Sequence, residues 1–508
     1  MIDKARSFST FVTFLLGQVL IDPGELHKKV QLKLGLRVPK KKRKRSRAEQ
    51  AEDRGEYTQA KVLASVPARL PITRTRNARV GRRVDNQLWW FSQGISVNDQ
   101  SVNGAHKPIR VLYVAVNSRP YTNSGYSKRT HSMVKAVRST GVEISVLTRL
   151  GYPSVIGVPF SRRQDNVETV VYARSMSWYF PLSASQQFEQ FKRLVVKRAL
   201  QLDATILHTT TDFRNATVVA SAAQELGIPW IYEVRGESEK TWLSSVDSGG
   251  PLRTTEAEHY RLSRQKELEA ARAANGVVAL SEISAQDLAA NGVSRNKICV
   301  APNSAEEALF ESTWTQESAR EHTGLAAPYL VGTVTSVVRY EGLETMLRAM
   351  DLLPKSVHFA IVGDGSDLNR LRDLVSDLGI GERVTFAGRK NQDNIVPWYK
   401  SLDLFVLPRI DAPVCRAVTP IKPLAAMALG IPVVASDLPA IREVTGGFAR
   451  YVTPDDPVEL ARAVQEVRRG NYDADSARHW AETRTWDNVS FILKKFYEEI
   501  SFASRGEL

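Results

Sequence analysis

Cysteine is nearly absent from this chain of 508 residues, which contains only Cys299 and Cys415. Two distant cysteines provide neither the disulfide framework of a small secreted protein nor a zinc cluster. The sequence therefore predicts a protein of a reducing compartment, and we expect it in the cytoplasm. No set of side chains has the spacing of metal ligands, so we expect neither a metal nor a cofactor.

Several common motifs are also missing. Neither half of the chain contains the GxGxxG fingerprint of dinucleotide-binding enzymes or the Walker lysine loop of nucleoside triphosphatases. No arrangement of serine, histidine and acid stands out as a hydrolase triad. These absences argue against a dehydrogenase or an NTPase.

The apolar run at the N-terminus, residues 8–21, is too short to cross a membrane. It has fourteen residues with interspersed Ser, Thr and Gln, whereas a spanning helix needs about 20. The sequence IDPGE follows it, which is not the small-residue cleavage site of a signal peptide. We interpret this run as an amphipathic or interfacial helix.

Positive charge is concentrated near the N-terminus. The net charge is +14 at pH 7. Residues 1–106 contain 21 Lys and Arg against 9 Asp and Glu, while the other 402 residues contain 48 against 46. The basic character therefore belongs to an N-terminal appendage, residues 1–105, and the remaining chain is nearly neutral.

Six successive cations at residues 40–45 cannot pack against one another. One interpretation is attraction to an anionic membrane surface through residues 1–47, which would place the protein at the inner face of the membrane. A solvated linker is the alternative, and nucleic acid is the least favoured partner. Trp89, Trp90 and Phe91 predict that the end of the appendage docks on an apolar surface.

From residue 109 onward, short apolar runs alternate with segments of helical spacing. Alternation of this kind is typical of βαβ units and a parallel sheet, and it restarts after a break around residues 306–328. The predicted fold class is α/β, with two Rossmann-like, doubly wound domains that face each other across a cleft. The expected parts are an appendage (1–105), a first domain (106–308), a second domain (309–485) and a C-terminal helix that crosses back to the first domain (486–508).

Several segments resemble the family 4 glycosyltransferases of the GT-B fold. In the second half these are residues 331–347 (VGTVTSVVRYEGLETML), 359–365 (FAIVGDG), 384–388 (VTFAG) and 418–437 (VTPIKPLAAMALGIPVVASD). In the first half, residues 125–129 (GYSKR) and 232–236 (YEVRG) resemble one bacterial branch of this family. The resemblance covers about residues 108–500.

The resemblance implies a retaining, metal-independent transfer of a hexose-like sugar. The donor would be a nucleotide-diphosphate sugar, and the acceptor a glycan or lipid-linked glycan of the cell envelope. The donor-binding residues that it suggests are Gly125, Arg339, Gly363, Arg389, Arg416, Thr419, Lys422 and Ala425.

Residues 419–422 give a physical reason for a diphosphate site. They precede a helix-prone run, and the N-terminus of a helix offers unpaired N–H groups and a partial positive charge. Lys422 and Arg416 would add full charges. A Pro-initiated helix with solvent-exposed cations is the alternative interpretation.

Two departures from the family pattern affect this site. The family usually has two glutamates eight residues apart, whereas this chain has Ala417 and Ala425. An Arg and a Lys that many relatives carry are replaced by Ser336 and Glu341, with Arg339 as a candidate substitute. A variant donor mode, an engineered inactive form and a degenerate enzyme all remain open.

Three residues near the ends of predicted strands in the first half are candidates for the catalytic side of the cleft. His208 ends one strand, and relatives often have a histidine near this position that contacts the donor sugar. Arg235 and Glu237 follow another strand and could bind an acceptor hydroxyl. A structural histidine and an ordinary ion-pair set are the alternatives.

Overall fold

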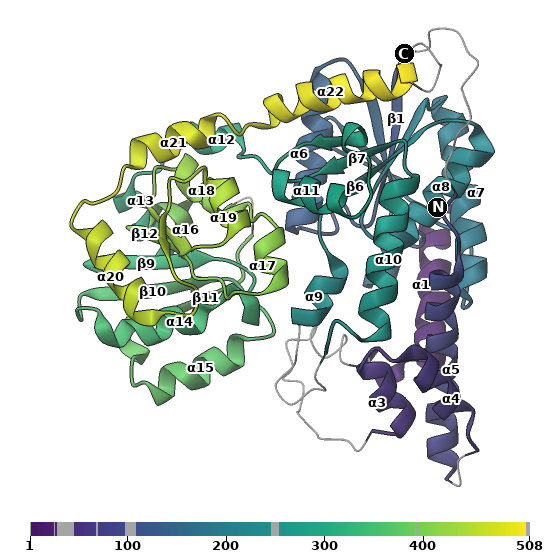
Figure 1. Ribbon diagram of the computed structural model, residues 1–508, viewed down its shortest axis with the longest axis horizontal. Helices are drawn as coiled ribbons and strands as arrows, with labels where there is room; N and C mark the ends of the chain where they lie inside the picture. The colour runs from purple at the N-terminus through teal and green to yellow at the C-terminus, as the bar shows by residue number, and fades with distance from the viewer. Residues whose placement is uncertain are drawn as a thin grey trace. The chain divides into compact units, whose positions relative to one another are not determined.

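The computed structural model describes residues 2–24, 26–27, 45–67, 70–96, 108–244, 253–391 and 394–503 (Figure 1). Most of the cation run, residues 40–44, lies outside the described residues. The chain divides into two compact units, and each contains one sheet. Unit 1 comprises Met1–Val278, Leu288–Cys299 and Lys494–Leu508, and unit 2 comprises Ala279–Asp287 and Val300–Leu493.

Unit 1 contains an eight-stranded sheet with the order β3-β4-β2-β1-β5-β6-β7-β8. Strands β1, β2, β4, β5 and β6 pair in parallel, while β3 is antiparallel to β4. Continuous buried runs, such as residues 111–115 in β1, are typical of strands covered on both faces. The strands are β1 (Arg110–Ala115), β2 (Glu143–Thr148), β3 (Gln164–Val167), β4 (Val170–Ala173), β5 (Ile206–Thr210), β6 (Trp230–Val234), β7 (Gly276–Ala279) and β8 (Ile298–Val300).

Capping residues set the ends of the helices between these strands. Helix α7 begins after Ser183 and α8 after Asp212, and both side chains accept backbone N–H groups of the first turn. Helix α8 ends at Gly227, whose φ of +64° suits glycine. The helices from α6 to α11 are α6 (Gly125–Ser139), α7 (Ala184–Leu202), α8 (Phe213–Leu226), α9 (Ser238–Ser244), α10 (Glu258–Ala273) and α11 (Glu282–Ala290).

Unit 2 contains a six-stranded, fully parallel sheet with the order β11-β10-β9-β12-β13-β14. Alternate residues of β12 belong to different apolar clusters: Phe405 and Leu407 to one, Leu404 and Val406 to the other. Both faces of the sheet are therefore packed. The strands are β9 (Tyr329–Val334), β10 (Val357–Val362), β11 (Val384–Gly388), β12 (Leu404–Leu407), β13 (Val433–Ser436) and β14 (Arg450–Val452).

The helices of the second half complete these layers. They are α12 (Glu307–Phe310), α13 (Gln316–Thr323), α14 (Leu343–Ala349), α15 (Leu368–Asp377), α16 (Val396–Lys400), α17 (Pro413–Ala417), α18 (Lys422–Ala428), α19 (Pro439–Thr445), α20 (Pro457–Arg468), α21 (Ala474–Glu482) and α22 (Trp486–Ala503). The two parallel-sheet α/β domains predicted from the sequence are confirmed. Unit 2 begins earlier than expected, at residue 300, and takes in residues 279–287.

The N-terminal helices are part of unit 1. They are α1 (Ile2–Ile21), α3 (Arg47–Asp53), α4 (Tyr57–Ser65) and α5 (Pro71–Ser92). Phe91 stacks on Phe213 of α8 with 5.3 Å between ring centroids, and Trp89 and Trp90 pack against Phe188 of α7. The predicted docking of this aromatic segment is confirmed, and no unit boundary follows residue 105.

Helices α1 and α5 lie side by side along unit 1 (Figure 1). Among the described residues, no helix combines the length and the apolar character needed to cross a membrane.

The Phe91 contact predicts a stability effect. Replacing this buried ring in Phe91→Ala should lower the free energy of unfolding of unit 1 by about 3 kcal/mol, because it removes apolar contact and leaves a cavity. Urea unfolding followed by circular dichroism measures the change. Leu200→Ala, at an exposed position on α7, is the control and should change stability by less than about 0.5 kcal/mol. Equal stability of both variants would contradict the described packing.

A second effect concerns pH. The buried carboxyl of Glu267 accepts hydrogen bonds from the Phe213 N–H (2.9 Å) and from the Tyr232 hydroxyl, and burial raises its pKa to about 8. A carboxyl with a raised pKa in the folded state contributes stability at low pH, and this contribution is lost as pH rises through about 8. The stability of the wild type relative to Glu267→Gln should therefore fall between pH 5 and pH 9. Urea titrations at several pH values test this, and a constant difference would refute it.

Candidate functional site

A buried carboxylate, Glu233, organises one end of the unit 1 sheet. It is the last but one residue of β6 and accepts hydrogen bonds from the Tyr113 hydroxyl (2.6 Å) and from Arg129 Nε (2.9 Å), while Arg235 Nη2 lies 2.8 Å away. Burial opposes ionisation, but Arg235 and Arg129 outweigh it and hold the pKa of Glu233 well below its usual range. The carboxylate thus joins β1, α6 and the loop after β6.

The two motifs of the first half meet at this network. The guanidinium of Arg235 donates to the Tyr126 carbonyl (3.0 Å) and to Thr130 Oγ1 (2.6 Å) at the start of α6. A Cβ atom at Gly236 would lie 2.3 Å from the Tyr126 hydroxyl, so this glycine admits the tyrosine ring. Gly125, the first residue of α6, has open space where a side chain would project. Residues 125–130 and 232–236 therefore form one local structure.

His208 occupies the interior of this sheet. Its ring is fully buried in β5, where Nδ1 shares a hydrogen bond with the Tyr497 hydroxyl of α22 (2.8 Å). Burial lowers the pKa of His208 to about 4, so the ring is neutral at pH 7. The expected contact with a donor sugar does not fit this position, and the structural alternative does. A histidine on a central strand lies inside the sheet because both faces are covered.

Arg235 and Glu237 do not form one cluster. Arg235 points to Glu233, while Glu237 forms an ion pair with Lys240 (2.6 Å). Arg264 of α10 lies 4.0 Å from Glu237 and 3.6 Å from Glu239. Both glutamates are buried, and burial raises the pKa of Glu239. The ion-pair alternative describes Glu237 better than a role in acceptor binding.

Unit 2 contains a cluster of charged residues around Glu341. Glu341 lies in the short helix η3 (Arg339–Glu341) and is buried between Lys422 Nζ and Arg409 Nη2, each 2.9 Å from the same carboxylate oxygen. Lys422 also donates to Thr335 Oγ1. Burial opposes ionisation, but Arg409 and Lys422 lower the pKa of Glu341 to about 2. Glu341 is therefore ionised at neutral pH, whereas burial lowers the pKa of Lys422.

The cluster lies where the topology predicts a ligand site. Thr335 follows β9 and Arg409 follows β12, and these two strands are neighbours in the middle of the sheet. In open parallel sheets, ligands bind beyond the carboxyl ends of the strands. Lys422 is the first residue of α18, and a quarter of its side chain is exposed. It is the member of the cluster that a ligand can reach.

Two glycines let the surrounding loops approach closely. A Cβ atom at Gly363 (φ +153°) would lie 1.7 Å from the Thr335 carbonyl oxygen. One at Gly342 (φ +67°) would lie 1.8 Å from the Pro408 carbonyl oxygen. Gly363, expected from the sequence to contact the donor, thus positions Thr335, and Gly342 brings η3 against the loop after β12. Both glycines therefore allow the loops that carry the cluster to pack closely against one another.

The second cation beside Lys422 is Arg409, which the sequence analysis missed. The expected partner, Arg416, is exposed at the end of α17 and forms a bidentate pair with Asp411 (2.5 and 2.6 Å). Arg339 and Arg389 are also exposed. Arg409 comes two residues after the buried strand β12, and that place at a strand end is a signal that could have identified it.

The remaining predicted residues are near Lys422 in sequence but lack a charged group. Thr419 is buried, its carbonyl accepts from Asn303 Nδ2 (3.0 Å), and its hydroxyl finds no hydrogen-bond partner among the described residues. Ala417 ends α17, and Ala425 lies on α18, half-buried against the apolar cluster. Within the described ranges no group of three or more His, Cys, Asp or Glu side chains could hold a metal ion.

Comparison with known families gives two matches that follow each other along the chain. Residues 124–304 match the family described as "Glycosyl transferase 4-like domain", and residues 328–469 match "Glycosyl transferases group 1". The break between the two matches coincides with the break in the strand and helix alternation.

Curated relatives have glycosyltransferase names. The chain is 30% identical over 159 residues to the uncharacterized glycosyltransferase MJ1607 of Methanocaldococcus jannaschii, which is 30% of this chain and 40% of that protein. It is 30% identical to the lipopolysaccharide core biosynthesis glycosyltransferase LpsE of Rhizobium meliloti (30% of this chain, 44% of that protein). The chain thus spans less than half the length of these relatives.

Solved structures share the fold over most of the described chain. The sucrose-phosphate synthase of Thermosynechococcus elongatus superposes with a TM-score of 0.62 at 18% identity, covering 78% of this chain and all of that one. Anabaena HepE, solved in complex with UDP-glucose, gives 0.57 at 19% identity, covering 77% and 99%. Together with the two family matches, they show that this chain belongs to the family 4 type of glycosyltransferases with the GT-B fold.

Proposed function

We propose that the protein transfers a hexose-like sugar from a nucleoside-diphosphate donor to a glycan or lipid-linked glycan, with retention and without a metal ion. The observation that supports this most strongly is the cluster of Lys422, Arg409 and Glu341 at the carboxyl ends of β9 and β12. A solved structure of the same fold, HepE, holds UDP-glucose, which favours a UDP-sugar donor. Two relatives are named for lipopolysaccharide core biosynthesis, which favours an acceptor of the cell envelope.

The reaction needs positive charge where the diphosphate departs. An ammonium group has three N–H donors, and Lys422 uses two of them on Thr335 and Glu341. The third can meet a phosphate oxygen without breaking the cluster. Because Glu341 and Thr335 already hold the ammonium, little reorganisation is needed when the negative charge develops, which is the requirement for electrostatic catalysis.

We propose that the enzyme acts in the cytoplasm, at the inner face of the membrane. A lipid-linked acceptor is held at a membrane surface, so an enzyme that uses it benefits from binding there. The excess of Lys and Arg in residues 1–106 supports this location, since cations near an anionic surface contribute on the order of 1 kcal/mol each.

A second candidate is a catalytically impaired GT-B protein that binds a sugar nucleotide or glycan without turnover. Ala417 and Ala425 cannot accept hydrogen bonds from donor hydroxyls. In addition, Glu341 neutralises part of the charge that would meet a diphosphate. Turnover separates the candidates. Release of UDP or GDP from a panel of sugar nucleotides, measured with a lipid-linked or glycan acceptor, supports the enzyme, and ligand-induced thermal stabilisation without release supports the binding protein.

The structure predicts unequal roles for the two cations first proposed from the sequence. Lys422→Gln should weaken UDP binding at least tenfold, about 1.4 kcal/mol, because it removes the charge that faces the ligand. Arg416→Ala should change the affinity less than twofold, because this side chain is exposed and already paired with Asp411. Isothermal titration calorimetry with UDP measures both. A larger loss in Arg416→Ala than in Lys422→Gln would refute the assignment.

Ala425 offers a gain-of-function test. It lies one turn after Lys422 on α18, and a carboxylate there could accept hydrogen bonds from ribose hydroxyls. Ala425→Glu should tighten sugar-nucleotide binding by one to two orders of magnitude, the contribution of a charged hydrogen bond. Ala425→Gln is the control, since it has nearly the same volume without the charge. Weaker binding in Ala425→Glu than in Ala425→Gln would show that the site has been rebuilt around alanine.

A further inference from the structure

Helix α1 turns small and polar residues toward unit 1, together with Phe14, whose ring meets that of Phe180 edge-on with 5.3 Å between centroids. Ser7, Thr10 and Gly17 are its buried residues. The Ser7 hydroxyl lies 3.2 Å from that of Ser154 and 2.9 Å from that of Ser161. An amphipathic helix of a globular protein normally buries its apolar side instead.

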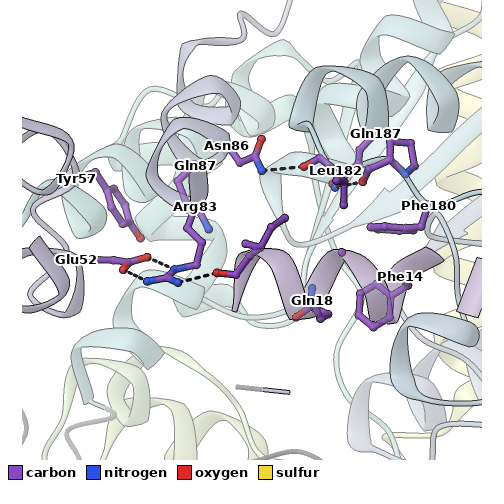
Figure 2. A pocket seen from close by; sticks show the side chains of 13 residues that line it. Phe14, Gln18, Glu52, Tyr57, Arg83, Asn86, Gln87, Phe180, Leu182 and Gln187 are labelled. Atoms are coloured by element: carbon purple, nitrogen blue, oxygen red, sulfur yellow. Dashed lines mark hydrogen bonds and ion pairs between the residues drawn. The ribbon is translucent and has the colours of Figure 1, made fainter. Parts of the chain in front are cut away.

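The inner side of α1 borders a cavity with many polar groups (Figure 2). The cavity measures about 270 Å³, and Gln18 of α1 and Asn86 of α5 are among its lining residues. Arg83 of α5 donates to the Ile21 carbonyl (3.0 Å) and forms a bidentate pair with Glu52. Polar contacts therefore hold this end of α1 against unit 1.

The outer side of α1 is apolar. Ile2, Phe8, Leu16, Val19 and Leu20 are exposed, with 60% of Leu16 accessible to solvent. At 100° per residue, these positions span about 120° of the helix surface, and the centre of this arc lies about 160° from the centre of the arc that holds Ser7, Thr10 and Gly17. The stretch from residue 7 to residue 21 contains no charged residue. Exposed apolar residues gathered on one side of a helix in this way mark an interaction surface.

Aromatic residues and cations border this stripe. Phe160 stacks on Phe8 with 5.2 Å between centroids, and both Phe160 and Trp178 are more than half exposed. Arg6 lies 4.9 Å from the centre of the Trp178 ring. The neighbouring charged residues are Lys4, Arg162 and Arg163, with Asp3 paired to Arg163. Tryptophan beside exposed basic residues is typical of protein segments at the boundary of a bilayer.

We infer that the outer side of α1, with Phe160 and Trp178, binds the surface of an anionic lipid bilayer. The helix lies along unit 1, so it would lie in the plane of the interface with its apolar side among the acyl chains. The cations at its N-terminal end would contact anionic headgroups. This binding does not depend on the transfer reaction.

A second copy of the chain fits this surface less well. In a two-fold dimer the same patch meets itself. A dimer that stacked α1 on α1 would bring Lys4, Arg6, Arg162 and Arg163 of both copies near one another, with Asp3 as the acidic residue among them. A lipid surface supplies negative charge and a hydrocarbon layer together.

The test is sedimentation of the full-length protein with vesicles. Wild type should bind vesicles of phosphatidylcholine and phosphatidylglycerol (3:1) more tightly than pure phosphatidylcholine, and binding should weaken as salt rises. The double variant Leu16→Gln/Val19→Gln should need at least ten times more lipid for half-maximal binding. Leu200→Gln, at a site 67% exposed on α7, is the matched control and should bind as wild type does.

A fluorescent label locates the contact. Burial raises the pKa of the two native thiols, Cys299 to about 12 and Cys415 to about 11, so they react slowly at neutral pH. A polarity-sensitive dye on Val19→Cys should shift to the blue with vesicles, whereas the same dye on Leu200→Cys should not. Unchanged sedimentation of the double variant would overturn the inference. Failure of the wild type to bind vesicles would also overturn it. If light scattering then showed a dimer that Leu16→Gln/Val19→Gln dissociates, a second copy of the chain would be the occupant of this surface.

Discussion

Burying an ionised carboxylate is costly unless cations pair with it, and each unit of this protein has such a paired carboxylate at the carboxyl ends of its central strands. In unit 1, Glu233 lies between two arginines, and in unit 2, Glu341 lies between Arg409 and Lys422. Each carboxylate connects segments that follow different strands. Removing the central charge would leave buried arginines without their ion-pair partner, which would destabilise the loops that each carboxylate connects.

The two clusters differ in what they can do. The partners of Glu233 are fully buried, so this network fixes the start of α6 and leaves no charged group for a ligand. In the Glu341 cluster, Lys422 is partly exposed and, among the described residues, uses two of its three N–H donors. A buried carboxylate paired with two cations therefore has a structural role in unit 1. In unit 2 the same arrangement holds a lysine that is accessible for the proposed diphosphate binding.

The sequence predicted the fold well because buried parallel strands leave a strong local signal, as in residues 109–116 for β1. The order of residues also placed Lys422 at the start of a helix, where the structure has it, and its role in donor binding stays a prediction. It did not identify Arg409, because pairing with Glu341 depends on two strands that are neighbours in the sheet but far apart in the chain. His208 was misread because β5 continues to Thr210, so this histidine lies in the middle of a buried strand rather than at its end. Which side of α1 faces unit 1 depends on tertiary contacts, so the sequence alone did not predict that Ser7, Thr10 and Gly17 are buried.

The hydrogen bond between His208 and Tyr497 joins residues 289 positions apart, and it sets the order in which the protein can be completed. Strand β5 leaves the ribosome long before α22 does, so the interior of unit 1 stays open while all of unit 2 is being synthesised. Phe496 packs against Gly276 in the same region. The first unit to be translated therefore cannot close before α22 has been made, and nascent chains must keep the sheet of unit 1 partly uncovered until that helix emerges.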